Sequence, residues 1–320
     1  STPLYSSAAS DVYKRQVVIV GSTNVDKFIN VERFPKPGET LHIDQAQQEF
    51  GGGKGANQAI AAGRLEAETT FITKVGKEGN ADFIIDDFKE ASINTDYILT
   101  SENEETGQAF ITVTDEGQNT ILVYGGANMT LNAEDVNHGE QAIREADFVV
   151  AQLEIPIEAI EQAFNIAKAH GVTTILNSAP AIDLPETLLS LTDIIIPNET
   201  EAERLSGISI KNEADMQQTV DYFFECGIST VLITLGERGT YFATQHESHI
   251  VPAYQVKAID TTAAGDTFIG AFVSRLEKDL SNLEDAIRFA NQASSLTVQR
   301  KGAQASIPVS YTHLTLPTNR

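Results

Sequence analysis

The sequence has little of several features that would settle its function class at once. It holds one cysteine, Cys226, so no disulfide can form within the chain. This usage is typical of a reducing compartment, and we expect a cytoplasmic location. No apolar run approaches the ~20 residues that a membrane-spanning helix needs. The six histidines show no zinc-ligand spacing.

Positive charge is also scarce. The chain has 22 lysines and arginines against 45 aspartates and glutamates, which gives a net charge of −23. This balance argues against a broad basic face for nucleic acid or for an anionic membrane surface. A phosphate can still bind an acidic protein where backbone N–H groups and a metal ion supply local positive potential. Composition therefore leaves small anionic ligands open.

Short apolar segments alternate with longer amphipathic ones through most of the chain. We expect strands at residues 17–21, 70–75, 148–153, 173–177, 193–197, 230–235 and 239–244. We expect helices at residues 56–65, 81–91, 133–145, 157–169, 213–226, 267–278 and 283–299. Continuous apolar strands separated by helices indicate a parallel sheet covered on both faces, with ligands at the carboxyl ends of its strands. The predicted fold class is α/β, with a doubly wound, mainly parallel sheet flanked by helices.

One region breaks this alternation. Residues 107–124 contain two β-rich runs, AFITV and TILVY, joined by DEGQN, which is typical of a β-hairpin. The segment 26–50, which contains Pro35, Pro37 and Gly38, does not fit a parallel sheet either. We therefore expect a small β-sheet lid, from about residues 24–50 and 104–127, over the active edge of the main sheet.

Both ends of the chain differ from the sequence between them. Residues 1–16 lack the apolar core of a signal peptide and change abruptly into the strand-like VVIV. Residues 309–320 continue no helical or strand pattern. We interpret both segments as foreign or disordered tails, with a mobile native tail as the alternative. The remaining residues, 17–308, are expected to form one domain.

The segment 260–270, DTTAAGDTFIG, carries the clearest chemical signal. Three small residues, Ala263, Ala264 and Gly265, precede Asp266, and a helix-compatible run follows from residue 267. Unpaired N–H groups at the start of a helix favour an anion, and small side chains let it approach the backbone. Asp266 is then placed to take a proton from a hydroxyl that attacks a phosphate. The pattern suggests phosphoryl transfer from a nucleotide to an alcohol; the alternative is an ordinary turn capped by aspartate.

A second glycine-rich segment, GGGKGANQ at 51–58, only partly matches a nucleotide P-loop. A P-loop needs Ser or Thr after its lysine to reach Mg²⁺, and here Gly55 follows Lys54. What remains is a turn that opens a helix and offers Lys54 and Asn57 to a polar ligand. A flexible loop is the alternative.

Polar residues also follow several expected strands, at the edge where ligands gather. Asn24 and Asp26 come directly after the first strand and suit vicinal hydroxyls, although a turn and a helix cap use the same residue types. Glu154 ends the strand at 148–153. Asn198 and Glu201 have the spacing of a capping pair or of a hydrated metal–phosphate network.

With these segments assembled, the chain closely resembles the ribokinase branch of the ribokinase-like (PfkB) family of carbohydrate and nucleoside kinases. The most specific segments are GSTNVD, GGGKGANQ, NETEAE, ITLGERG, DTTAAGDTF and RKGAQAS, and the match runs from about residue 17 to 308. The resemblance implies a doubly wound α/β domain with a β lid. Departures are few: Gly51 precedes the usual glycine pair, and Ala263 stands where much of the wider family has glycine. The family's C-terminal segment is replaced by the unusual tail.

The resemblance also implies roles for individual residues. The substrate would be held by Asn24, Val25, Asp26, Gly53, Lys54, Gly55, Ala56, Asn57, Glu154 and Asp266. The nucleotide would contact Asn198, Thr234, Leu235, Gly236, Glu237, Arg238, Gly239, Gly265, Asp266 and Asn291. Asp266 would be the catalytic base, and Ala263, Ala264 and Gly265 the anion hole. K⁺ would bind at Asp260, Thr262, Thr297, Arg300, Gly302 and Ser306, and a hydrated Mg²⁺ network would involve Asn198 and Glu201.

The implied activity is MgATP-dependent phosphorylation of the 5-hydroxyl of D-ribose, with K⁺ as activator. The expected sugar residues include no aromatic platform for a nucleobase, which favours a free pentose. The alternatives are another sugar or nucleoside kinase of the family and, from a different class, a non-catalytic sugar-binding sensor. We expect no nucleic-acid or membrane partner, and a homodimer formed through the β edge of the lid.

Overall fold

The main sheet lies at the centre of the fold. The computed structural model describes residues 13–43, 46–77 and 81–310, and within them nine strands form this sheet in the order β13-β12-β11-β10-β9-β8-β1-β4-β5. Their bounds are β1 Gln16–Val20, β4 Glu68–Gly76, β5 Ile98–Ser101, β8 Phe148–Ala151, β9 Thr173–Leu176, β10 Ile194–Ile195, β11 Thr230–Thr234, β12 Thr240–Ala243 and β13 Ser248–Val251. The pairs β11–β12 and β12–β13 are antiparallel, and the other neighbours are parallel. The predicted mainly parallel sheet is confirmed.

Helices cover both faces of this sheet. They are α1 Lys54–Arg64, α2 Asp82–Glu90, α3 Ala133–Asn137, α4 Glu140–Glu145, α5 Ile157–Ala169, α6 Glu186–Ser190, α7 Glu199–Ser206, α8 Glu213–Glu225, α9 Ala264–Arg275 and α10 Leu283–Thr297. Successive strand residues point to opposite faces. In β1, Val17 and Ile19 therefore pack with α1, α2, α9 and α10, whereas Val18 and Val20 pack with α3, α4 and α5. No helix within the described ranges is long and apolar enough to cross a bilayer.

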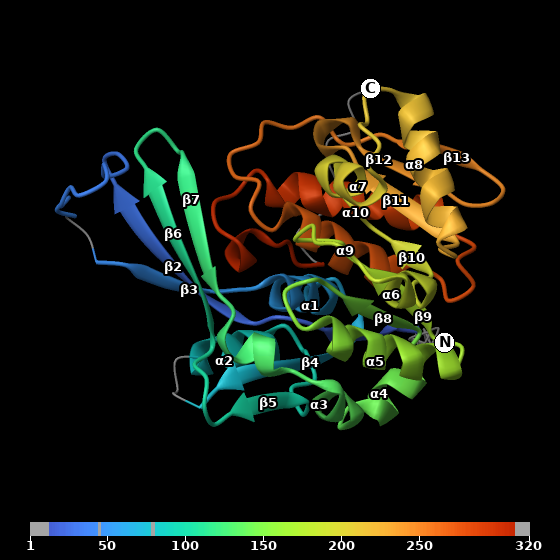
Figure 1. The fold of residues 1–320 in the computed structure, drawn as a ribbon, viewed down its shortest axis with the longest axis horizontal. Helices are drawn as coiled ribbons and strands as arrows, with labels where there is room; N and C mark the ends of the chain where they lie inside the picture. Colours follow the sequence, from blue (N-terminus) through green and yellow to red (C-terminus); the bar gives the residue numbers. More distant parts are fainter. Residues whose placement is uncertain (1–12, 44–45, 78–80, 311–320) are drawn as a thin grey trace, which may run out of the picture.

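A second sheet, the lid, stands away from this body at the left of Figure 1. Its strands are β2 Asn24–Val31, β3 Gln48–Gly52, β6 Gly107–Thr114 and β7 Asn119–Tyr124, in the order β3-β2-β6-β7. β6 and β7 form the predicted antiparallel hairpin. β2 begins shortly after β1 ends, and β3 leads directly into α1. The lid is therefore attached to the body at the edge where the parallel strands end.

Several element boundaries differ from expectation, each for a local reason. α9 begins at Ala264, because Ala263 adopts a left-handed conformation (φ 59°) and forms its N-cap. Asp266 consequently lies inside the first turn of the helix and not before it. The helix predicted at 133–145 is two helices, α3 and α4, interrupted at Gly139, where a Cβ would lie 2.4 Å from Ile72 Cδ1. The pattern also misses α6, α7, β5 and β13, which are too short to show a clear period.

Residues just outside the expected domain take part in the fold. The Tyr13 hydroxyl donates hydrogen bonds to both carboxylate oxygens of Asp147, at 2.8 and 2.9 Å. The Ser310 N–H donates to the carbonyl oxygen of Arg64 at 3.1 Å. Tertiary contacts therefore extend past the expected boundaries at 17 and 308. Gln16, the last residue of the expected N-terminal tail, begins β1, and residues 1–12 and 311–320 lie outside the described residues.

Candidate active site

The candidate site forms where helices α1 and α9 begin. The two helices pack closely because Gly270 of α9 places no side chain between them: a Cβ there would lie 2.4 Å from the Cβ of Ala61. This contact brings the first turns of both helices together. Asn57 Nδ2 donates to Oδ2 of Asp266 at 3.0 Å, and Gln58 Nε2 donates to Oδ1 at 3.0 Å. Both oxygens of the buried Asp266 carboxylate are thus held from α1.

Polar side chains from three segments gather beside Asp266. We call them the polar cluster: Asn24, Asp26, Lys54, Asn57 and Glu154. The first two lie on the lid strand β2, the next two lie in the first turn of α1, and Glu154 follows β8. Lid and body therefore both contribute to one group of hydrogen-bonding side chains, as the sequence motifs predicted.

Neighbouring residues fix the orientation of this cluster. Glu154 Oε2 accepts hydrogen bonds from the Ser22 hydroxyl (2.5 Å) and from the Lys54 backbone N–H (3.0 Å). Asn24 Oδ1 accepts from Asn128 Nδ2 at 2.8 Å. Sequence reasoning missed Asn128, which lies in the 3₁₀ turn Gly126–Thr130 and belongs to no recognisable motif. The cluster is therefore already ordered by the protein's own contacts.

The electrostatics of the cluster favour a ligand that donates hydrogen bonds. Burial, and then the negative charges of Glu154 and Asp266, raise the pKa of Asp26 from 3.8 to about 7. Burial lowers the pKa of Lys54, but the charges of Asp266, Glu154 and Glu201 outweigh it and hold that pKa above its ordinary value. Asn57 Oδ1 is buried and has no hydrogen-bond partner within the described part of the chain. A buried acceptor and several carboxylates together suit a ligand rich in hydroxyl groups.

Next to Asp266, the start of α9 presents backbone N–H groups. The Ala264 N–H donates to the Thr261 carbonyl at 3.2 Å, and the Thr267 N–H donates to the Ala263 carbonyl at 2.8 Å. Between them, no bond to another described residue is recorded for the N–H groups of Gly265 and Asp266. Gly265 lines an open cavity, and a Cβ there would meet no atom within 4 Å other than those of its chain neighbours and its own helix backbone. Of the small residues expected to form the anion hole, Gly265 offers the accessible donor.

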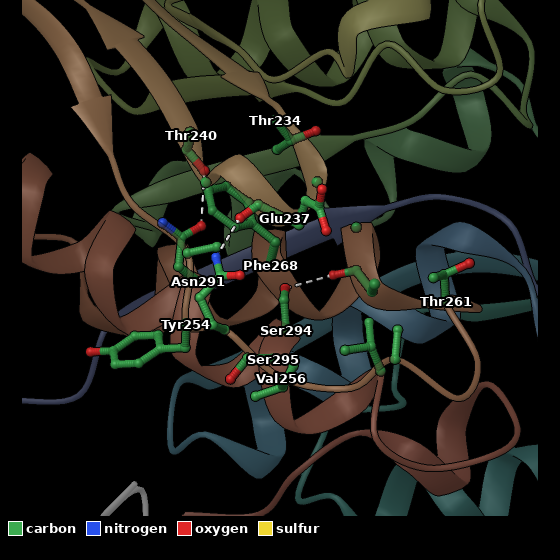
Figure 2. Close-up of a pocket in the computed structure, with 18 residues that line it drawn as sticks. Thr234, Glu237, Thr240, Tyr254, Val256, Thr261, Phe268, Asn291, Ser294 and Ser295 are labelled. Atoms are coloured by element: carbon green, nitrogen blue, oxygen red, sulfur yellow. Dashed lines mark hydrogen bonds between the residues drawn. The ribbon is translucent and has the colours of Figure 1, made fainter. Parts of the chain in front are cut away.

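A cavity of about 520 Å³ adjoins this helix start, and Figure 2 shows the side chains around it. Its lining includes six of the expected nucleotide residues: Thr234, Gly236, Glu237, Gly239, Gly265 and Asn291. The Asn291 side chain is fixed in the wall, because Nδ2 donates to the Val251 carbonyl (3.0 Å) and Oδ1 accepts from Thr240 Oγ1 (2.9 Å). The cavity is therefore large enough for a nucleotide-sized ligand.

Sequence reasoning missed the apolar part of this cavity. Ala253 and Val256 lie along it, and Phe268 and Val298 line it from α9 and the end of α10. These side chains carry no reactive group and follow no motif spacing. Only their position in the folded chain reveals them. They give the cavity the mostly apolar character that a flat aromatic ring requires.

The other expected nucleotide residues do not line the cavity: Asp266 directly follows the lining Gly265, and the remaining three make other contacts. Asn198 caps α7 together with Glu201: Asn198 Oδ1 accepts from the Glu201 N–H at 2.9 Å, and Glu201 Oε2 accepts from the Asn198 N–H at 2.9 Å. Leu235 is buried, and Arg238 forms an ion pair with Glu199. None of these three expected residues, Asn198, Leu235 and Arg238, lines the cavity. Burial raises the pKa of Glu201, although its hydrogen bond from Asn198 opposes the shift.

The expected cation residues lie in two adjoining segments. Asp260 Oδ1 accepts from the N–H (2.9 Å) and the hydroxyl (2.7 Å) of Thr262, and Oδ2 accepts from the Gly302 N–H at 2.9 Å. Burial raises the pKa of Asp260, but these hydrogen bonds outweigh it and hold that pKa below its ordinary value. Thr297 and Ser306 are buried, whereas Arg300 is exposed. The Asp260 carboxylate therefore connects the start of the segment 260–270 to Gly302, which follows α10.

Residues in the described part of the chain form no group of three or more His, Cys, Asp or Glu side chains able to hold a metal ion. Both oxygens of the Glu201 carboxylate already accept hydrogen bonds from Asn198. A divalent cation would therefore fit this site through water and phosphate oxygens, with Glu201 as an outer partner.

The chain is similar to known proteins over most of its length. Residues 14–310 match the pfkB family of carbohydrate kinases. The chain is 67% identical over 294 residues to the ribokinase of Staphylococcus aureus strain COL, covering 92% of this chain and 97% of that protein. It is 44% identical over 295 residues to the Haemophilus influenzae ribokinase, covering 92% and 96%. The structure of Arabidopsis thaliana ribokinase complexed with ribose and ATP superposes with a TM-score of 0.85 at 34% identity, covering 93% and 97%.

The raised pKa of Asp26 has a consequence for stability. Between about pH 4 and pH 7 the folded protein keeps a proton on Asp26 that the unfolded chain has lost, so this stabilisation is present below pH 4 and is lost as pH rises to 7. A shift of this size corresponds to at most about 4 kcal/mol. We expect Asp26→Asn to lose less thermal stability between pH 5 and pH 8 than the unchanged protein, measured without ligand.

The exposed Asp96 provides a control for this measurement, since its carboxylate is solvated. Asp96→Asn should follow the pH dependence of the unchanged protein. The two charged neighbours of Asp26, namely Glu154 and Asp266, remain in every variant. Identical pH dependence in Asp26→Asn and the unchanged protein would contradict the buried, protonated state.

Proposed function

The chain belongs to the pfkB family of carbohydrate kinases, and we propose that it phosphorylates D-ribose with ATP to give D-ribose 5-phosphate and ADP. One observation carries the assignment. Asp266 lies between the polar cluster and the nucleotide-sized cavity, with both carboxylate oxygens oriented by α1. A base in that position is within reach of a sugar hydroxyl and of a phosphoryl group beside the helix start.

The polar cluster supports a free sugar as the acceptor. Its members are two amides, three ionisable groups that accept or donate strongly, and no aromatic ring. Asp26, Glu154 and the unpartnered Asn57 Oδ1 accept hydrogen bonds from hydroxyl groups, and Lys54 donates to them. We infer that Asn24 and Asp26 bind vicinal hydroxyls and that the 5-hydroxyl points to Asp266.

In the reaction, Asp266 accepts the proton of the 5-hydroxyl while that oxygen attacks the γ-phosphorus of ATP. The new O–P bond forms as the bond from the γ-phosphorus to the bridging oxygen breaks, and ADP leaves with those electrons. The N–H groups of Gly265 and Asp266 donate to the transferring phosphoryl group. We infer that the lid closes over the sugar, which excludes water and limits hydrolysis of ATP.

Two cations complete the proposal. Mg²⁺ would neutralise charge on the phosphate oxygens, ordered through water near Asn198 and Glu201. K⁺ would bind beside Asp260, whose hydrogen bonds to Thr262 and Gly302 bring the two expected cation segments together. Since Asp260 precedes the anion hole by only a few residues, a cation there would stabilise the conformation of that turn.

We also infer a homodimer formed through the lid. β7 is an edge strand, and its residues 119–124 are exposed along their full length. They include Ile121, Leu122, Val123 and Tyr124, of which Leu122 is 73% exposed. An unpaired edge with consecutive exposed apolar residues invites pairing with a second copy.

The first prediction concerns the base. Removing a positioned base costs about 10²–10⁴-fold in rate. We expect Asp266→Asn to lower kcat by that factor in a coupled assay of ADP formation, while calorimetry shows ribose binding largely unchanged. Asp285→Asn changes an exposed aspartate in the first turn of the neighbouring helix α10 and should retain activity. Near-normal turnover of Asp266→Asn would refute the assignment.

The second prediction concerns the substrate and the monovalent cation. Ribose, 2-deoxyribose, fructose and adenosine are compared with MgATP, in KCl and in tetramethylammonium chloride of equal ionic strength. We expect the highest kcat/KM for ribose and a faster reaction in KCl, with the KCl response lost in Asp260→Asn. Preference for adenosine or fructose would overturn the choice of sugar. Equal rates in both salts would overturn the K⁺ proposal.

The third prediction concerns the lid edge. Leu122→Lys places a charge on the exposed face of β7 without disturbing a buried contact. We expect light scattering to give the mass of a dimer for the unchanged protein and of a monomer for the variant. Lys77→Leu, at an exposed position outside the lid sheet, should leave the mass unchanged. A monomeric unchanged protein at working concentration would refute the dimer.

A further inference from the structure

A chain of buried amides contacts the Asp266 carboxylate. Gln58 is fully buried, and its Nε2 donates to Asp266 Oδ1 (3.0 Å) and to Asn177 Oδ1 (3.2 Å). Its Oε1 accepts from Gln152 Nε2 at 2.7 Å. Both the nitrogen and the oxygen of the Gln58 amide are therefore hydrogen-bonded. Of the partners, Gln152 directly follows β8 and Asn177 directly follows β9.

A backbone carbonyl determines which way these amides point. Asn177 Nδ2 donates to the carbonyl of Ile196 at 3.0 Å, so its oxygen must face Gln58. Gln58 in turn must present its nitrogen to that oxygen. The reversed orientation would bring Gln58 Oε1 against Asn177 Oδ1 and against the Asp266 carboxylate, and would lose two hydrogen bonds in a buried environment. The Ile196 carbonyl, acting through Asn177, thus fixes the orientation in which Gln58 presents its N–H groups to Asp266.

The glycine at position 21 leaves room for the Gln152 side chain beside Gln58. Gln152 is fully buried next to Gly21, where a Cβ would lie 2.0 Å from its Oε1. Glycine at position 21, just after β1, is therefore required for the glutamine to reach Gln58. Gln152 therefore contributes an oriented hydrogen bond to Gln58.

We propose that Gln58 is a positioning residue for the catalytic base, oriented by Asn177 and Gln152. A carboxylate oxygen has two lone pairs, and on each oxygen of Asp266 one is taken by α1, from Gln58 or Asn57. One lone pair on each oxygen remains to accept a hydrogen bond from the sugar hydroxyl. Gln58 thereby holds the carboxylate in one rotamer before substrate binds. This inference rests on the proposed function, since it takes Asp266 as the base.

Two substitutions separate orientation from packing. Gln58→Met keeps the length of the side chain and removes both hydrogen-bonding groups. Gln58→Glu keeps the shape and replaces the donor by an oxygen that faces Asp266. Misplacing a reacting group by about 1 Å costs up to about 10²-fold. We expect Gln58→Met to lower kcat by about 10–10²-fold with the KM for ribose changed less than threefold, and Gln58→Glu to lower kcat further. If Gln58 only filled space, the isosteric Gln58→Glu would be the better tolerated of the two.

A double-mutant cycle with Asp266→Asn supplies a readout that a structural role would not give. If Gln58 acts through Asp266, adding Gln58→Met to Asp266→Asn should leave the residual kcat unchanged within twofold, because the group it positions is gone. A purely structural contribution would lower the two rates by the same factor. Residual turnover is measured at high enzyme concentration, and thermal unfolding establishes that each variant is folded. Gln141→Met, on the exposed surface of α4, serves as the matched control.

The outcomes distinguish this inference from the proposed function. A collapse of kcat in Asp266→Asn with normal kcat in Gln58→Met would overturn the positioning role and leave the base in place. Equal losses from Gln58→Met in both backgrounds would also overturn it. Near-normal turnover in Asp266→Asn would overturn the base itself. Should Gln58→Glu prove unfolded, Gln58→Met and the cycle decide the question alone.

Discussion

The close approach of α1 and α9 is the contact on which the site depends. Gly270 allows the two helices to meet at Ala61, a separation at which any side chain would collide. Their first turns then converge, although Asn57 and Asp266 are more than two hundred residues apart in the chain. Because helices are stiff, small changes at that glycine would be transmitted to the carboxylate as a displacement of its whole first turn.

The two ligand regions differ in how the protein builds them. The polar cluster is made of side chains with strong mutual electrostatics, so its residues shift one another's pKa values, as Asp26 and Lys54 illustrate. The cavity beyond Asp266 relies on shape, on backbone groups at Gly265 and on apolar walls. Asp266 lies next to both, because the left-handed Ala263 starts the helix early enough to place the acid in its first turn, directly after the cavity-lining Gly265.

Sequence patterns were sufficient for the layers of the fold and for the polar residues at the strand ends. They could not give the start of α9, because a left-handed alanine leaves no mark in the composition. Nor could they reveal Asn128, or the pairing of Gln58 with Asn177, because both depend on which loops the sheet order brings together. Phe268 and Val298 were missed for another reason: apolar residues signal a core, and only the open space beside them indicates a ligand.

The attachment of the lid has a thermodynamic consequence. Asn24 and Asp26 belong to the lid strand β2, whereas Lys54, Asn57 and Asp266 belong to the body. A ligand that contacts both sets couples lid closure to ligand binding. Each of the two processes is then made more favourable by the other, and by the same free energy. A water molecule is too small to contact the lid residues and the body residues at once. This arrangement therefore selects a ligand by its length as well as by its hydrogen-bonding groups.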